Sequence, residues 1–147
     1  MGSTFLSLHY HIVFSTKERR PLIKAAWRAK LHEYLGGTLK GLDASPQIIG
    51  GIEDHVHILT GLRATHCLAD IMRELKKASS RWVLEKFDPA FGWQDGYAAF
   101  TVSNSHLAAV REYIAHQEEH HQKLGFIDEL KRLLEKNDVK FDPQYLL

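Results

Sequence analysis

Two strand-like segments that are separated by only two residues constrain the fold of this chain most. Residues 46–52 and 55–61 are rich in isoleucine and other apolar residues, and only Glu53 and Asp54 lie between them. Because so short a connection joins neighbouring antiparallel strands, we expect a β-hairpin here. The rest of the fold must be built around this hairpin.

Segments on both sides of the hairpin extend the pattern to β-α-β-β-α-β. A strand is expected at residues 5–15, and a helix from Pro21, which suits a first helical turn, to about Leu39. A second helix is expected from about His66 to Phe87, and a fourth strand at 96–102. This order indicates an α+β fold that is ferredoxin-like (RRM-like), with an antiparallel sheet and two helices on one face.

Two more helices are expected after this core. Ser103, Asn104 or Ser105 can cap a helix that runs to about Lys123, and Gly125 stops it. The sequence then predicts a last helix at about 126–136 and an irregular tail. We therefore expect one domain over residues 1–147, with a core at about 5–103, a helix carrying Tyr113 at about 105–123, and a C-terminal helix and tail at about 126–147.

The first three expected helices have apolar positions at helical spacing, which predict their buried faces. These positions are Leu22, Ala26, Ala29, Tyr34 and Leu35 in the first helix, Leu68, Ile71, Met72, Leu75 and Trp82 in the second, and Leu107, Val110 and Ile114 in the third.

Composition limits the class of protein. The 147 residues are 44% hydrophobic and 25% charged, which is ordinary for one globular domain. A single cysteine, Cys67, excludes an internal disulfide and is typical of the reducing cytoplasm, where we expect the protein to be. No apolar run approaches the roughly 20 residues of a membrane span, so no membrane association is expected. The net charge of +1 means that any nucleic-acid binding depends on local basic patches.

The motif His55-Val56-His57 predicts a metal site. Residues i and i+2 of a strand point to the same face, so both imidazoles project together, and neutral imidazole is a common ligand of divalent metals. Asp54 can orient one of these imidazoles, although it also fits a simple turn residue. With ten histidines in the chain, about one such pair is expected by chance, so two histidines with no metal remain the alternative.

Tyr113 and Gln117 share one face of the expected third helix, since they are four residues apart. A tyrosine phenolate can attack phosphorus and form a phosphotyrosine ester, and a metal assists by polarising the phosphate. The amide oxygen of Gln117 is a candidate metal ligand, with His116, His120 and His121 as rivals. The alternative is that Tyr113 packs at the edge of an amphipathic helix.

Basic and aromatic residues provide candidate contacts to nucleic acid. The basic residues can grip phosphates, although a charged helix face is also what solvent exposure alone produces. Trp93, Tyr97 and Phe100 can stack on unpaired bases or pack in the core. The candidate DNA-binding residues are Lys17, Arg19, Arg20, Arg73, Lys76, Lys77 and Arg81.

Four segments together resemble a known family. They are LHYHIVF at 8–14, EDHVHIL at 53–59, WQDGY at 93–97 and YIAHQEEHH at 113–121. In this order they resemble the single-tyrosine HUH transposases of small bacterial and archaeal insertion sequences, a family that also includes the REP-associated tyrosine transposases. The resemblance covers nearly the whole chain.

The resemblance implies a function and a site. It implies that His55, His57 and Gln117 bind Mg²⁺ or Mn²⁺, and that Tyr113 is the catalytic nucleophile on single-stranded DNA, leaving a 5′-phosphotyrosine. It also implies recognition of DNA hairpins near the element ends, and a homodimer in which the tyrosine helix can complete the partner's active site. The link at 103–105 would permit that exchange.

Other functions remain open from the sequence. One is a domesticated protein of the same family that nicks or binds hairpins without moving an element. Another is a metal-dependent phosphodiester hydrolase that uses water as its nucleophile. A third is a ferredoxin-like nucleic-acid binder without catalysis.

Overall fold

The expected β-hairpin is part of a four-stranded sheet in the computed structural model, which describes residues 2–121 and 124–146. Strands β2 (Ser45–Gly51) and β3 (His55–Gly61) pair in antiparallel register. β3 also pairs with β1 (His9–Ser15), and β1 pairs with β4 (Ala98–Thr101), all antiparallel, which gives the order β2-β3-β1-β4. The expected ferredoxin-like α+β architecture is confirmed.

Strand β1 is shorter than expected from the sequence. Its pairing ends at His9 opposite Gly61, and the side chain of Phe5 is 90% exposed. Residues 5–8 have strand-like side chains, but the strand begins only at His9, so the expectation of a strand from residue 5 was wrong for these four.

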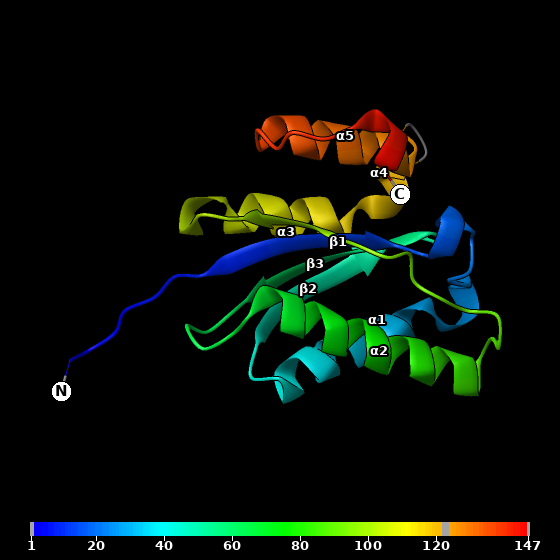
Figure 1. Cartoon of the computed structure of the whole chain (residues 1–147), viewed down its shortest axis with the longest axis horizontal. Coiled ribbons are helices and arrows are strands. Elements are labelled where there is room, and N and C mark those ends of the chain that lie inside the picture. Colours follow the sequence, from blue (N-terminus) through cyan, green and yellow to red (C-terminus); the bar gives the residue numbers. More distant parts are fainter. Residues whose placement is uncertain (1, 122–123, 147) are drawn as a thin grey trace.

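Helices α1 (Ala25–Gly41) and α2 (Leu68–Lys86) cover one face of the sheet (Figure 1). α1 begins four residues after Pro21, because Ile23 is fully buried and its backbone N–H donates to the carbonyl of Glu53 at 2.9 Å. The expected apolar face of α1 was partly wrong, since Ala26 and Ala29 are exposed. The buried stripe of α1 is Trp27, Leu31, Leu35 and Leu39.

The main apolar core lies between the sheet and these two helices. Strand alternation directs Ile12, Phe14, Val56 and Ile58 into it, and each is at most 2% exposed. α2 adds Ile71, Met72 and Leu75, as expected, and Trp82 packs at the edge of the core. This face of the sheet is therefore closed by apolar packing.

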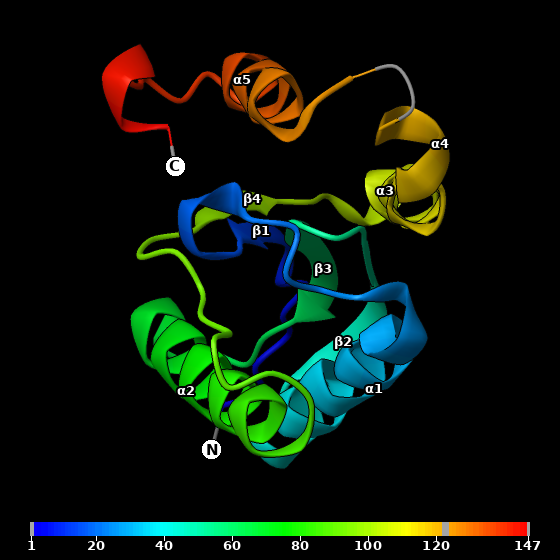
Figure 2. The same cartoon turned by 90° about the vertical axis from the view of Figure 1, so that its right-hand side faces the viewer.

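The C-terminal helices lie on the opposite face of the sheet (Figure 2). The single helix expected at 105–123 is broken: α3 spans Leu107–Ala115 and α4 spans Gln117–His121, with His116 between them at φ −111° and ψ 33°. Its expected end at Lys123 lies outside the described residues. The expected last helix is confirmed as α5, Phe126–Lys136.

Helix α5 is attached to the sheet by a second apolar cluster. The cluster consists of Val13, Phe100, Phe126, Leu130, Leu134 and Leu146.

The tail after α5 is more ordered than expected, because it contains a short 3-10 helix at Pro143–Tyr145 and a buried Leu146. Two further 3-10 turns lie at Lys17–Arg19 and Asn104–His106. Among the helices within residues 2–121 and 124–146, none has the length and apolar character to cross a membrane.

Candidate active site

The histidine pair of β3 lies on the face of the sheet that α3, α4 and α5 cover. His55 and His57 alternate with the core residues Val56 and Ile58, so their side chains point away from α1 and α2. His11 of β1 points the same way. All three are buried, with His55 and His57 at 0% exposure and His11 at 4%.

Hydrogen bonds on the outer nitrogens fix both imidazoles. Nδ1 of His55 lies 2.7 Å from Oδ1 of Asp54, and Nδ1 of His57 lies 2.8 Å from Nε2 of His11. Such bonds set the orientation and tautomer of a metal-binding histidine. The geometry therefore supports the orienting role considered for Asp54, and it adds His11, which the sequence gave no reason to single out for such a role.

Helices α3 and α4 bring Tyr113 and Gln117 to this pair. Oε1 of Gln117 lies 3.1 Å from Nε2 of His55, and the ring of Tyr113 lies with its centroid 5.7 Å from that of His57. Close packing makes this possible, because a Cβ on Gly50 of β2 would clash with the backbone carbonyl oxygen of Ile114. The structure thus brings together all four residues that the sequence singled out.

Glu129 of α5 completes the cluster. One carboxylate oxygen lies 2.9 Å from Nε2 of His57 and 3.1 Å from Nε2 of His121, while the other accepts a hydrogen bond from the Tyr113 hydroxyl. Its side chain is 2% exposed. Sequence reasoning missed this residue; the only signal is a glutamate beside the apolar stripe of Phe126, Leu130 and Leu134.

The three rival histidines have different positions. His121 joins the cluster, since its Nε2 is also 3.1 Å from Oε1 of Gln117. His120 packs against the ring of Tyr113 with centroids 4.5 Å apart. His116 is exposed at the break between α3 and α4, and it bonds to the carbonyl of Glu112 instead.

Burial and hydrogen bonding give these groups distinct pKa values. Burial lowers the pKa of His57 to about 4, and also that of His11 to about 3. Burial also opposes charge on His55, but bonds to Asp54 and Glu129 raise its pKa to about 9. Burial and the bond to Glu129 hold the pKa of Tyr113 above its usual value.

Glu129 is the anionic group of the cluster. Burial alone would raise the pKa of its carboxyl, but hydrogen bonds from His121, His55 and His57 hold it well below the usual range. A buried carboxylate surrounded by imidazoles is a setting in which a cation is stabilised.

The donor set fits a divalent metal ion. Ligand atoms of His55, His57, His121 and Glu129 all lie within 4.8 Å of one another. Imidazole nitrogens with carboxylate and amide oxygens are ligands that divalent first-row metals and Mg²⁺ accept. The chemistry of the buried groups therefore agrees with a metal site.

A cavity of about 1100 Å³ leads to Tyr113. It lies between β4, α3 and α5, and its lining includes Phe100, Tyr113, Glu129, Arg132 and Lys136. The phenol is thus reached from outside through a cavity with two cationic side chains on one wall.

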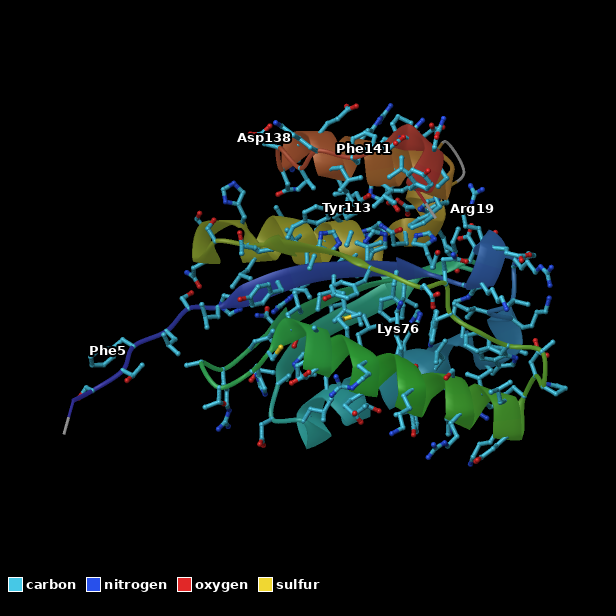
Figure 3. All side chains as sticks on the ribbon, viewed as in Figure 1. Phe5, Arg19, Lys76, Tyr113, Asp138 and Phe141 are labelled. Carbon is cyan, nitrogen blue, oxygen red and sulfur yellow. The ribbon has the colours of Figure 1, made fainter. Side chains whose placement is uncertain are left out.

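The basic residues singled out in the sequence lie apart from this cavity. Figure 3 shows Lys76 and Tyr113 on opposite sides of the sheet. Lys76 donates to the carbonyls of Gln94 and Gly96, and Arg73 pairs with Asp70 at 3.0 Å, whereas Lys77 and Arg81 are exposed on the same helix. Lys17, Arg19 and Arg20 are exposed near the end of β1, and Arg20 pairs with Glu18 at 2.7 Å.

The three aromatic candidates are also divided. Phe100 is buried in the second cluster and lines the cavity, while Trp93 packs against Phe14 with ring centroids 4.7 Å apart. Tyr97 is 41% exposed. The core interpretation therefore holds for Phe100 and Trp93, and Tyr97 is free to contact a ligand.

Fold and site together define a class: a small α+β protein whose helical tyrosine is held against a buried, metal-compatible cluster of histidines. Comparison with protein families agrees with this class. The family model described as "Transposase IS200 like" matches residues 4–117, which is most of the chain. The chain belongs to this family of transposases.

Solved structures show the same fold. A candidate transposase from Deinococcus radiodurans R1 is 24% identical, with a TM-score of 0.64 over 80% of this chain and 96% of that one. A REP-associated tyrosine transposase bound to a REP hairpin is 14% identical, with a TM-score of 0.62 over 84% of this chain and 76% of the other. No match was found among curated proteins.

Proposed function

We propose that this transposase cleaves and rejoins single-stranded DNA at the ends of an insertion sequence through a 5′-phosphotyrosine intermediate. One observation carries the proposal: the hydroxyl of Tyr113 lies at the boundary between the metal-compatible cluster and the cavity that opens beside it. A nucleophile in that place reaches a phosphate in the cavity while the cluster lies next to it.

The residues have separate roles in the proposed reaction. The oxygen of Tyr113 attacks phosphorus, a new oxygen–phosphorus bond forms, and the bond to the 3′ oxygen breaks. The phenol loses one proton and the leaving 3′ oxygen gains one, so the exchange is balanced and needs no nucleotide cofactor. His55, His57 and Gln117 would hold Mg²⁺ or Mn²⁺, and a metal ion bound there would neutralise charge on the phosphate.

The proposed DNA is a single strand that contains hairpins near the element ends. The fold shared with a protein bound to a REP hairpin supports this choice of substrate. The exposed members of the basic set, such as Arg19 and Arg81, are proposed contacts to its phosphates.

A covalent-adduct assay tests this function. The protein is incubated with single-stranded element ends and Mn²⁺ or Mg²⁺, and a protein–DNA species is sought after denaturation. Wild type and Tyr145→Phe, which alters an exposed tyrosine of the tail, should form the adduct, whereas Tyr113→Phe and samples with chelator should form none. An adduct in Tyr113→Phe would refute the assignment. Cleavage to a free 5′-phosphate without an adduct would indicate the hydrolase instead, and hairpin binding or nicking without rejoining would indicate the domesticated protein.

A homodimer is part of the proposal, with exchange of the tyrosine helix at residues 103–105. Within the chain described here, Tyr113 and His57 lie together, which is the unexchanged arrangement. Mixing Tyr113→Phe with His57→Ala protein tests exchange, because only an exchanged dimer can build one intact site from two defective chains. Adduct formation in the mixture supports exchange, and its absence alongside active wild type contradicts it.

A further inference from the structure

The C-terminal helix α5 places a carboxylate at the centre of the histidine cluster. Oε1 of Glu129 lies 2.9 Å from Nε2 of His57, 3.1 Å from Nε2 of His121 and 3.4 Å from Nε2 of His55. Three imidazole nitrogens thus converge on one oxygen. This oxygen comes from a helix beyond residue 117, where the family match ends.

The outer hydrogen bond of His55 orients its inner nitrogen. A carboxylate only accepts hydrogen bonds, so Nδ1 of His55 donates to Asp54. Nε2 of His55 therefore points into the cluster, where it lies 3.1 Å from Oε1 of Gln117 and 3.4 Å from Oε1 of Glu129. Buried acceptors that face one another are stabilised by a positive charge among them.

We propose that Glu129 and His121 bind the metal ion together with His55 and His57, so that α4 and α5 close the metal site. The inference rests on the proposed function, because it takes the β3 histidines as metal ligands. The ligand atoms of all four residues lie within 4.8 Å of one another, and three of the four side chains are fully or almost fully buried. Three imidazoles with one carboxylate suit a first-row ion that accepts imidazole nitrogen better than Mg²⁺, which prefers oxygen ligands.

The second oxygen of Glu129 links this site to the nucleophile. It accepts the hydrogen bond from the Tyr113 hydroxyl, so one rigid carboxylate contacts both the histidines and the phenol. A ligand held in this way fixes the position of the phenol relative to the metal. The opposite arrangement, in which Glu129 competes with the metal for the histidines, predicts the opposite effect of removing its charge.

Direct titration with Mn²⁺ in the absence of DNA distinguishes the two arrangements. Glu129→Gln keeps the size of the side chain and removes its charge. Glu135→Gln is the matched control, since it makes the same change at an exposed position of the same helix. His57→Ala tests the underlying site, and free Mn²⁺ is followed by its electron paramagnetic resonance signal.

Glu129→Gln should weaken Mn²⁺ binding by at least about tenfold, and Glu135→Gln should bind as wild type does. Unchanged or tighter binding by Glu129→Gln would overturn the proposal and identify the carboxylate as a bystander or a competitor. Mn²⁺ binding by His57→Ala at the wild-type affinity would instead refute the β3 metal site of the proposed function. If Glu129→Gln does not fold, a wild-type crystal with Mn²⁺ decides: Glu129 and His121 bonded to the ion support the proposal, and either side chain turned away refutes it.

Discussion

The two faces of the sheet use the same strands for different purposes. On β3, Val56 and Ile58 point into the apolar core under α1 and α2, whereas His55 and His57 point into a polar cluster under α3, α4 and α5. All four side chains are fully buried. Burial alone therefore does not separate structural from functional residues here, and the partners of each side chain do.

The difference has an energetic meaning. Apolar burial on the α1–α2 face stabilises the fold in proportion to the area removed from water. A buried carboxylate with several imidazoles contributes little net stability, because desolvation of the charges offsets their attraction. The first face thus holds the strands in place, and the second uses that rigidity to position its ionisable groups.

Substitutions at two adjacent positions of β3 should separate stability from metal binding. Ile58→Ala removes a fully buried side chain from the apolar face and should lower the free energy of unfolding by about 2–5 kcal/mol. It should leave Mn²⁺ affinity unchanged under conditions where the protein is folded, whereas His57→Ala should lose Mn²⁺ binding. Denaturant unfolding and Mn²⁺ titration measure the two effects, and a loss of affinity in folded Ile58→Ala would show that the two faces are not independent.

The contact between α3 and β2 should tolerate an added methyl group less well than α1 on the other face of the sheet does. Gly50→Ala places a methyl group against the carbonyl of Ile114, so α3 must shift, and we expect a loss of about 1–3 kcal/mol together with reduced adduct formation through Tyr113.

Gly37→Ala in α1 is the matched control for this substitution. Its new methyl group meets no atom within 4 Å, so helix propensity should stabilise the protein by up to about 1 kcal/mol. Equal effects of the two substitutions in thermal unfolding would argue against the close contact between β2 and α3.

Much of the fold followed from the sequence because the relevant signals are local. Two strand-like segments two residues apart predicted the hairpin, and the helical spacing of Ile71, Met72 and Leu75 predicted the buried face of α2. The expected start of α1 was wrong because a long-range hydrogen bond from Ile23 to Glu53 ties the segment before Ala25 to the connection between β2 and β3. The break at His116 could not be predicted, since neither proline nor glycine marks it.

Part of the candidate site could also be predicted from the sequence, because its signals are local. His55 and His57 share a face by strand geometry, and Tyr113 and Gln117 by helix geometry. Glu129 is brought to them by the packing of α5 on Val13 and Phe100, and His11 by the register of β1 against β3. Such contacts between distant segments leave no periodic pattern in the sequence.

The α1 side of the molecule should contribute its own dependence of stability on pH. His32 of α1 is largely buried near Arg28, and burial lowers its pKa to about 4 from an ordinary 6.5. Because the folded protein favours neutral His32, the contribution of this residue to the free energy of unfolding is complete above about pH 6.5 and is lost as the pH falls towards 4. We expect a loss of about 1–2 kcal/mol over that range in wild type.

His32→Gln should remove this part of the pH dependence, since glutamine does not titrate. The free energy of unfolding measured from pH 7 to pH 4.5 checks the expectation. His116→Gln, at an exposed position on the other side of the sheet, is the control. If His32→Gln loses stability with falling pH as steeply as the control does, His32 is not the group responsible.

The smallest expected effect decides which face carries the DNA. Arg132 lines the cavity beside Tyr113, and Arg81 is an exposed arginine of α2 on the other side of the sheet. If the residue contacts a phosphate, its substitution to alanine should weaken single-stranded DNA binding by about 0.5–1 kcal/mol. It should also make the slope of the logarithm of the binding constant against the logarithm of the salt concentration shallower by about 0.7. Because the scissile phosphate must reach Tyr113, we expect this loss for Arg132→Ala at low salt, and we also expect a loss for Arg81→Ala, since Arg81 is among the proposed phosphate contacts. An equal loss for Arg81→Ala would mean that the bound strand extends around the sheet to α2, as the basic pattern of the sequence predicts. A loss for Arg81→Ala alone would place the DNA away from the cavity.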